Sequence, residues 1–419
     1  MIEENIRIPY KLIEDKDINV MRLSSKDGVL TPHISINKPR NAVLKEVRYN
    51  DLVFNPRRIN IGGIALFKEK NSKYFVSSSY RIIRCKETLL PDYLYLVLRT
   101  KPLLESIGEL MRRDSGDYLS LFDFQQIPIP LPSLTIQREI VDEYNETLLK
   151  MEKIEHQISC MDKYMEEEII NSLGIGNMHT NNAKKKQEIA LVSISSMRSW
   201  YVPQLLNDIK IRNIFNTKIF PRRPLIEFVE VNPLSKRKAK LNNMSVPYVS
   251  NNSISKDIGE IETYKQKSND FLKGDLRIFN GDILLAKNLN GIREGEVAIV
   301  NFQHHSLGYT SSDFFVLRSR EDSKVAVSYI YYLLRSKLFR QNYSNSIDVC
   351  RTNKRLNEDS LKNIELPILP EEDQASLIQK LDILNNHKKK LIKQVAILKG
   401  YPREKELLRK LFFHKGELS

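Results

Sequence analysis

The sequence of 419 residues has few cysteines, one tryptophan and no long apolar segment. Its three cysteines, Cys85, Cys160 and Cys350, lie far apart, so they indicate neither a disulfide framework nor a CxxC metal site. No run of about eighteen apolar residues occurs, and the acidic start contains no apolar signal segment. These absences exclude a membrane-spanning or disulfide-stapled class, and we expect a protein of the reducing cytoplasm.

Catalytic and metal-binding motifs are also missing. The chain contains no GxxxxGK phosphate loop, no HExxH and no set of Cys and His at metal-ligand spacing. The adjacent His304 and His305 would point to opposite faces of a strand, which favours a turn or a surface pair over a metal site. The serines of "SSSY" at residues 77–80 have no base nearby in the sequence. We therefore predict no catalytic residue and no metal.

Positive charge, in contrast, is abundant. The 66 Lys and Arg residues exceed the 52 Asp and Glu residues and give a formal net charge of +14. Such an excess favours a polyanionic partner, with nucleic acid as the first candidate. Many basic proteins merely carry solvated basic faces, so charge alone leaves that alternative open.

The clearest positive feature is an internal duplication. "VSSSYRIIR" at 76–84 matches "TSSDFFVLR" at 310–318, and "YLYLVLRTK" at 93–101 matches "YIYYLLRSK" at 329–337. Farther upstream, Asp51 corresponds to Asp282 and Gly62 to Gly295. The separation between matching blocks drifts by only a few residues, as small loop insertions would cause. Each copy begins with strand-like segments and continues into helix, which predicts two mixed α+β domains.

Both copies end in a proline run followed by a long helix, "QQIPIPLPSLTIQREIVDEY" at 125–144 and "KNIELPILPEEDQASLIQKL" at 362–381. Alternating prolines remove N–H donors, so each run is expected to be an edge strand or an extended connection. We expect the first helix to begin near Thr135, with the threonine hydroxyl as its cap. The predicted parts are a first domain, a first helix, a linker, a second domain, a second helix and a helical tail, at residues 1–132, 133–172, 173–205, 206–369, 370–400 and 401–419.

The two long helices carry matching apolar stripes at spacings of three and four, with one missed step at Lys388. A single stripe would favour an amphipathic helix lying on its own domain. Two matching stripes favour packing of the helices against each other, as a spacer between the domains. The predicted seam consists of Met151, Ile154, Ile158, Met161, Leu384, Leu391, Val395 and Leu398.

Polar and basic loops recur at the same place in both copies, at residues 55–63 and 287–295, each between two strand-like runs. Arg, Lys and Asn side chains suit phosphates and base edges, although a solvated hairpin tip is an equal alternative. A dense basic run lies at residues 235–240, and Ser-containing turns follow each loop. The candidate DNA-binding residues are Asn55, Arg57, Arg58, Asn60, Ser78, Tyr80, Lys236, Arg237, Lys238, Lys287, Asn288, Asn290, Arg293, Ser311 and Ser312.

The proline junctions, the two "YLYLVLR"-like helices and the ending "LLRKLFFHKGEL" make the chain resemble the specificity subunits of Type I restriction-modification systems. The resemblance covers most of the chain. It implies two target-recognition domains separated by two long antiparallel, coiled-coil-like helices, with each domain reading one half of a split DNA sequence. It also implies a non-catalytic subunit that joins two methyltransferase subunits, which use S-adenosylmethionine, and ATP/Mg-dependent restriction subunits.

One departure from this pattern is expected in the first domain. The second domain is preceded by "PLIEFVEVNPLSKRKAK", whereas only a short acidic segment precedes the first. The first domain is thus predicted to lack an N-terminal strand and a basic run. Two other functions stay open at this point: the recognition subunit of a Type IIB-like enzyme, and a coiled-coil scaffold that binds no DNA.

Overall fold

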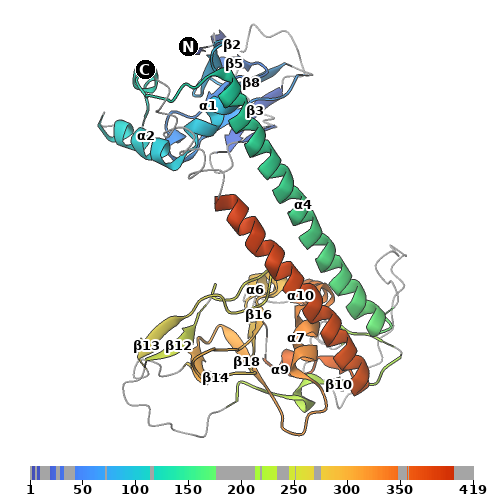
Figure 1. The fold of residues 1–419 in the computed structure, drawn as a ribbon. Helices are drawn as coiled ribbons and strands as arrows, with labels where there is room; N and C mark the ends of the chain where they lie inside the picture. Colours follow the sequence, from blue (N-terminus) through green and yellow to red (C-terminus); the bar gives the residue numbers. More distant parts are fainter. Residues whose placement is uncertain are drawn as a thin grey trace. The chain divides into compact units, whose positions relative to one another are not determined.

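The computed structural model describes residues 2–4, 7–9, 19–24, 29–32, 43–70, 73–113, 118–175, 213–217, 219–233, 245–250, 252–268, 275–347, 356 and 358–400 (Figure 1). The chain divides into two units. Unit 1 contains Met1–Glu155 and Lys393–Ser419, and unit 2 contains His156–Ile392. The predicted tail and most of the predicted linker lie outside the described residues.

Each unit contains a four-stranded antiparallel sheet with the same strand order. The order is β1-β9-β6-β7 in unit 1 and β11-β18-β15-β16 in unit 2. The strands of unit 1 are β1 (Ile2–Glu4), β6 (Leu52–Phe54), β7 (Ile64–Leu66) and β9 (Arg81–Cys85). Those of unit 2 are β11 (Val229–Val231), β15 (Ile283–Ala286), β16 (Val297–Ile299) and β18 (Phe314–Ser319).

A second sheet is repeated as well, including one parallel pair within otherwise antiparallel neighbours. The orders are β2-β5-β8-β3-β4 and β14-β17-β12-β13, in which β3–β8 and β12–β17 are parallel. The strands of unit 1 are β2 (Arg7–Pro9), β3 (Asn19–Ser24), β4 (Val29–Pro32), β5 (Val43–Val47) and β8 (Tyr74–Ser77). Those of unit 2 are β12 (Ser245–Val249), β13 (Lys265–Ser268), β14 (Leu276–Phe279) and β17 (Leu307–Thr310).

The expectation that the first domain lacks an N-terminal strand is wrong. Strand β1 pairs with β9 as β11 pairs with β18, since Glu3 lies opposite Arg84 and Glu230 opposite Arg318. The acidic segment "IEE" has little strand propensity, and its place is set by pairing with the edge of β9 rather than by its own composition. Both copies therefore have this sheet complete.

Helices cover one face of each four-stranded sheet, and the second sheet covers the other. Phe54 of β6 packs in a cluster with α1 (Pro91–Leu98), whereas Val53 packs with residues of the second sheet. Leu285 of β15 packs with α7 (Val327–Arg335), and Leu284 packs with β12 and β14. Burial on both faces explains why strands β6 and β15 are apolar at every position.

Several further helices complete the two units. Unit 1 contains η2 (Ile59–Ile61), α2 (Lys101–Arg113) and α3 (Leu121–Gln125). Unit 2 contains η4 (Leu225–Glu227), α6 (Leu289–Glu294), α8 (Lys337–Ile347) and α9 (Glu358–Lys362). It also contains a two-stranded sheet of β10 (Arg222–Pro224) and β19 (Glu365–Pro367), so the second proline run is an edge strand, as predicted.

The junction between each domain and its long helix has the same construction in both copies. Helix α4 spans Leu134–Ser172 and helix α10 spans Glu371–Gly400. In unit 1 the fully buried Gln137 accepts a hydrogen bond from Leu90 N at 2.8 Å, and its amide donates to Pro132 O at 2.8 Å. In unit 2 Gln374 accepts from Ala326 N at 3.1 Å and donates to Leu369 O at 2.9 Å.

A tyrosine fastens the proline run itself. Tyr93 donates to Pro130 O at 3.0 Å and Tyr329 donates to Pro367 O at 2.8 Å. Burial raises the pKa of both phenols above their usual range. A carbonyl of each proline run is thus paired by a tyrosine hydroxyl. The predicted cap at Thr135 is wrong, because the Ser133 hydroxyl accepts from Ile136 N at 3.5 Å instead.

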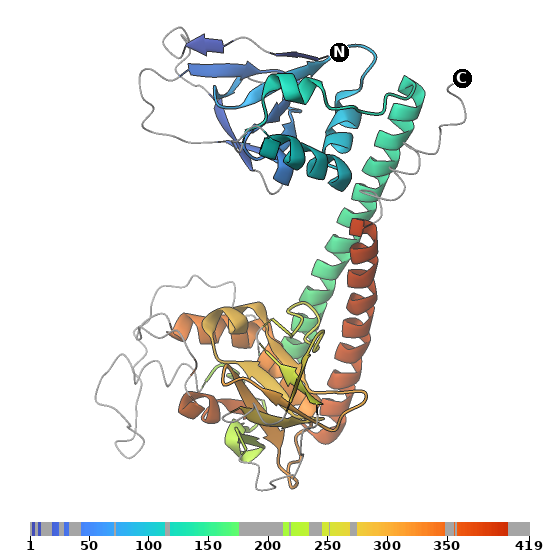
Figure 2. The same cartoon turned by 90° about the vertical axis from the view of Figure 1, so that its left-hand side faces the viewer.

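Helices α4 and α10 run antiparallel, which confirms the predicted fold class (Figure 2). In unit 2 Lys380 pairs with Glu168 at 2.9 Å and Lys388 with Asp162 at 2.7 Å, so one residue number rises as the other falls. The order continues in unit 1, where Lys399 lies 3.2 Å from Glu155. The eight predicted seam residues are half-buried or buried: Met151, Ile154, Ile158, Met161, Leu384 and Leu398 are half-buried, and Leu391 and Val395 are buried.

Candidate nucleic-acid interface

The two polar loops predicted from the sequence connect equivalent strands. Residues 55–63 lie between β6 and β7 and contain η2, and residues 287–295 lie between β15 and β16 and contain α6. Each loop ends at a glycine in the left-handed region, Gly62 at φ 87° and Gly295 at φ 80°. Side chains other than glycine rarely adopt this conformation, so the two glycines close the loops in the same way.

Two of the predicted DNA-binding residues shape the loops from inside. The Asn55 side-chain oxygen accepts a hydrogen bond from Arg57 N at 3.0 Å. Asn288 occupies the matching position, and its oxygen accepts from Gly291 N at 2.7 Å as the N-cap of α6. The oxygen of each side chain is thus engaged within the protein, while the amide nitrogen keeps donor capacity.

The remaining predicted loop residues differ in exposure. Arg57 and Arg58 are exposed in unit 1, and Asn290 and Arg293 are exposed in unit 2. Asn60 is half-buried and lines an open groove along α2 that also contains Arg99, Lys101 and Arg112. Lys287 is half-buried, with its Nζ 4.7 Å from the centre of the Phe315 ring. Each loop therefore presents at least one arginine to solvent, where it can contact a phosphate or a base edge.

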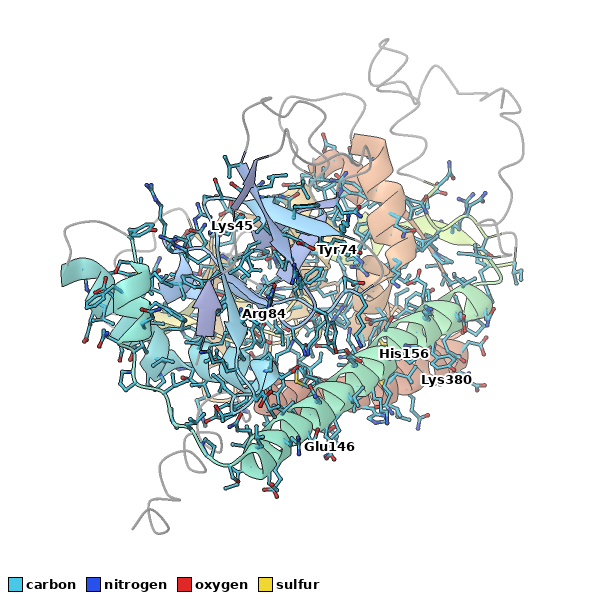
Figure 3. The ribbon with its side chains drawn as sticks, turned by 90° about the horizontal axis from the view of Figure 1, so that it is seen from above. Lys45, Tyr74, Arg84, Glu146, His156 and Lys380 are labelled. Atoms are coloured by element: carbon cyan, nitrogen blue, oxygen red, sulfur yellow. The ribbon has the colours of Figure 1, made fainter. Side chains whose placement is uncertain are left out.

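The predicted serine turns lie at the ends of β8 and β17. In unit 2 the turn contains Ser311 and Ser312, and Asp313 O accepts a hydrogen bond from Lys287 N at 2.8 Å, which brings the turn and the loop together. In unit 1 the half-buried Ser78 and Tyr80 occupy the turn. Buried Lys45, seen in Figure 3, holds this turn by donating from Nζ to Tyr80 O at 2.8 Å. Lys236, Arg237 and Lys238 lie outside the described residues.

Cations stacked on tyrosines form a further candidate surface that the sequence did not indicate. In unit 1 the Lys68 and Lys70 ammonium groups lie 5.3 and 4.1 Å from the ring centre of exposed Tyr49. In unit 2 half-buried Lys267 lies 3.3 Å from the ring centre of Tyr248, but this ring is buried and, unlike Tyr49, does not face solvent. Aromatic rings flanked by lysines suit nucleic-acid bases and phosphates. Strand pairing and turns bring these residues together, so no spacing in the sequence reveals them.

Neither a metal site nor a membrane span is found in the part of the chain that the structure describes. Among those residues, no three His, Cys, Asp or Glu side chains are grouped to hold a metal ion. None of the described helices is both long enough and apolar enough to cross a bilayer. The surface described above offers hydrogen-bond donors and positive charge, which are the groups that bind a polyanion.

Comparison with known proteins identifies the class of this fold. The family model for the Type I restriction modification DNA specificity domain matches residues 11–158 and 222–397. Because these ranges cover well over half of the chain, the protein belongs to this family. Each of the two matched segments contains most of the strands of one unit and part of its long helix.

Several solved structures are similar over most of their length at low identity. A chain from a study of complex assembly and conformational transition of the type I R-M system is 15% identical, with a TM-score of 0.48 over 93% of this chain and 89% of that one. The HsdS subunit from Thermoanaerobacter tengcongensis is 17% identical, with a TM-score of 0.37 over 93% and 88%. The S subunit from M. genitalium is 13% identical, with a TM-score of 0.48 over 98% and 93%. No curated protein matches the chain at a significant level.

Proposed function

We propose that this protein is a specificity subunit that recognises a bipartite double-stranded DNA target, with one half-site read by each unit. The single observation that carries the proposal is the repetition of the whole reader: two sheets in the same order, the same paired loop, and the same Gln and Tyr junction to a long helix. A duplicated reader on antiparallel helices suits two half-sites separated by an unspecified spacer.

Catalysis belongs to partner subunits in this proposal. Two DNA methyltransferase subunits supply S-adenosylmethionine chemistry, and restriction and translocation subunits supply ATP- and Mg-dependent cleavage. Family membership supports these assignments, and the chain offers hydrogen bonds and charge for binding. The purified chain alone is therefore expected to transfer no methyl group to DNA, and robust transfer without a partner would overturn the proposal.

DNA binding by the full chain is tested by its salt dependence. Fluorescence anisotropy with duplex DNA should show the logarithm of affinity falling linearly with the logarithm of salt concentration, because Lys and Arg displace counterions from phosphates. A scaffold that binds only proteins would have no DNA affinity to lose. The formal net charge of +14 makes some non-specific binding expected, so the target itself is best identified by sequencing methylated DNA from a host that carries the partner methyltransferase.

The arginine pair of the first loop gives a residue-level test. Replacing exposed Arg57 and Arg58 with alanine should weaken recognition of one half-site about tenfold and lower the salt slope by about one for each arginine that binds a phosphate. The matched control replaces two exposed cations of α4, Arg138 and Lys153. Equal effects in both double variants would mean that the loop has no special role.

The ruler function of the helices is tested by length. Inserting one helical turn in α4 and one in α10 lengthens each by about 5.4 Å. The methylated motif should then have a spacer that differs from that of the wild-type complex. A motif with the original spacer would contradict a ruler role of these helices.

A further inference from the structure

A tight hairpin of unit 2 lies against the long helices. Its tip is the 256–260 loop, Lys256 to Glu260, which follows a bridge between Ile254 and Ile261. Ser255 N donates to Glu260 O at 2.8 Å, and Gly259 N donates to Ser255 O at 2.7 Å. The hairpin connects β12 and β13, so the tip belongs to the second sheet of the recognition domain. Contacts that hold this tip therefore also orient the second sheet of unit 2.

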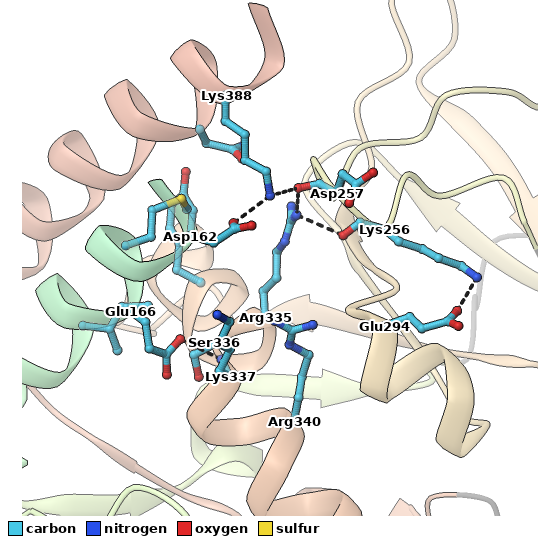
Figure 4. Close-up of a pocket in the computed structure, with 14 residues that line it drawn as sticks. Asp162, Glu166, Lys256, Asp257, Glu294, Arg335, Ser336, Lys337, Arg340 and Lys388 are labelled. Atoms are coloured by element: carbon cyan, nitrogen blue, oxygen red, sulfur yellow. Dashed lines mark hydrogen bonds and ion pairs between the residues drawn. The ribbon is translucent and has the colours of Figure 1, made fainter. Parts of the chain in front are cut away.

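Side chains of α7 and α10 converge on the backbone carbonyls of the tip. From α7, Arg335 donates to Asp257 O and Ile258 O, and Tyr331 donates to Gly259 O at 3.1 Å. From α10, Lys388 donates to Asp257 O at 2.7 Å (Figure 4), and Asn385 donates to Ile258 O at 3.3 Å. The loop thus loses its backbone freedom to contacts from two helices.

Lys388 extends this set of contacts to a third helix. Only 4% of Lys388 is exposed, yet its Nζ also donates to the Asp162 carboxylate of α4 at 2.7 Å. Burying an ammonium group is costly unless its charge and its donors are satisfied. Here a carboxylate balances the charge, and that carboxylate and a carbonyl accept from two of the three N–H donors. A leucine or methionine at this position would continue the apolar stripe without that cost. The lysine therefore fixes the relative positions of the groups it binds, and we expect it to add little to the free energy of unfolding.

The loop approaches the helices so closely that only glycine fits at its end. Gly259 has φ +73°, and a Cβ on it would overlap Arg335 Nη1 and Tyr331 Oη. In addition, Lys389 of α10 pairs with Glu260. A side chain at position 259 would therefore force the loop away from Arg335 and Tyr331 and strain its left-handed backbone.

The first copy lacks the side chains for this attachment. Leu148 and Met151 stand in α4 where Asn385 and Lys388 stand in α10, and neither can donate a side-chain hydrogen bond. Arg99, the counterpart of Arg335, donates to Gly62 O at 3.0 Å, in the polar loop of unit 1. The attachment of a domain through a buried lysine is thus a property of unit 2.

We propose that Lys388 is a positioning residue that fixes the second recognition domain against both long helices and thereby sets the spacing at which the second half-site is read. This inference rests on the proposed function. Asp162, Lys388 and Asp257 place α4, α10 and the recognition domain in one contact, so a sliding of either helix must break a buried interaction. Lys388, the one polar residue in the apolar stripe of α10, is thus the residue that prevents such sliding.

The test replaces Lys388 with the residue of the first copy, K388M. The neighbouring cavity of about 130 Å³ gives the methionine room, so the change removes the contact without overpacking. The matched control is K380M, which removes the exposed pair with Glu168 on the same helix. K388R, which keeps the charge and both acceptors, is the conservative rescue. All variants are assembled with the methyltransferase and assayed on duplexes whose spacer differs by one base pair in either direction.

K388M should lower the preference for the correct spacer about tenfold or more, because losing one partner of a buried polar interaction frees the loop. K380M should keep the wild-type preference and K388R most of it. Hydrogen exchange of the amides at residues 256–260 in the full chain should accelerate in K388M alone. If K388M hinders folding, D162N removes the counter-charge of Lys388 from α4 and leaves only a neutral acceptor there, so it should relax the spacer preference in the same direction.

The outcomes separate two failures. A wild-type complex that methylates no split site overturns the proposed function, and this inference with it. A wild-type complex with a defined spacer that K388M and D162N leave unchanged overturns the positioning role alone. Loss of activity in K388M at every spacer equally, with unaltered preference, also contradicts that role.

Discussion

The two units share a frame, meaning their two sheets and the junction to a long helix, and they differ in how the domain is attached to the helices. In unit 1 the fully buried Asp51 accepts two hydrogen bonds from Arg84, at 2.7 and 2.8 Å, and Asp282 accepts two from Arg318 at 2.8 and 2.7 Å in unit 2. The same carboxylates also accept from Arg48 N and Phe279 N, both at 2.8 Å. Duplication has thus kept the buried polar interactions down to their geometry.

The differences lie where the repeated frame meets solvent or a neighbouring element. Arg58 in the first loop, which is exposed, stands where the second loop has Gly291. At the position of Lys388 the first copy has Met151, whose side chain cannot donate a hydrogen bond. The repeated frame is a fixed support, whereas loop tips and helix attachments change residue type. Under the proposed function, these changes would allow the two units to read different half-sites.

The largest effect is expected from the repeated ion pair. Arg84→Ala leaves the Asp51 carboxylate buried without its counter-charge and should lower the free energy of unfolding of unit 1 by about 3 kcal/mol. Arg318→Ala should cost unit 2 at least as much, because 29% of the Arg318 side chain is exposed against 40% of Arg84. Chemical denaturation of the full chain measures both.

A double variant sharpens this prediction. D51N combined with R84M removes the stranded charge and should be less destabilising than R84A, because a buried unpaired carboxylate costs more than an absent ion pair. If R84A and R318A prove neutral, the pairs are incidental and the shared frame is held by apolar packing alone. If only one of them is harmful, the two copies differ in an interaction that looks the same in both.

A smaller effect is expected at the helix junctions. Gln137→Leu leaves Leu90 N and Pro132 O without their hydrogen bonds, which should cost about 2 kcal/mol, and Gln374→Leu should cost a similar amount through Ala326 N and Leu369 O. The control Q157L changes an exposed glutamine of α4 and should be nearly neutral. Thermal unfolding of the three variants provides the measurement, and a Q157L effect as large as that of Q137L would contradict a junction role.

Much of this fold follows from patterns that a single sequence displays. The two proline runs predict edges because proline lacks a donor, and β19 is such an edge. Matching blocks predict matching sheets, and the strand orders agree. The long helices follow from apolar spacing, and their ends at Ser172 and Gly400 lie where the pattern stops.

The remainder depends on long-range contacts that no local pattern carries. Strand β1 exists because β9 offers an unpaired edge, which the composition of Ile2–Glu4 does not reveal. Lys388 interrupts a stripe in the sequence, and only the positions of Asp162 and Asp257 O show what the ammonium group binds. For the predicted DNA contacts, the structure adds which side chains shape the loops, such as Asn55 and Asn288, and which face solvent, such as Arg57 and Arg293.

The smallest expected effect distinguishes the copies at one position of the repeated sheet. Cys85 of β9 lies opposite Ile2, and its counterpart in β18 is Ser319, opposite Val229. Burial, followed by the charge of Asp51, raises the pKa of the Cys85 thiol from 9.0 to about 12. The folded state then holds this proton more tightly than the unfolded state, so its contribution to stability is complete below pH 9 and declines as pH rises toward 12.

Cys85→Ser should therefore leave stability at neutral pH nearly unchanged and make it fall less steeply above about pH 9. The difference in slope between wild type and C85S is expected to stay under about 1.4 kcal/mol per pH unit, because a single thiol can change the number of bound protons by at most one. Denaturation midpoints of both proteins between about pH 8 and pH 10 measure it, and subtraction cancels the shared titration of tyrosines and lysines. Parallel curves would mean that the thiol titrates alike in the folded and unfolded chains. The substitution would then have made the first copy equal to the second at a position where the difference has no energetic consequence.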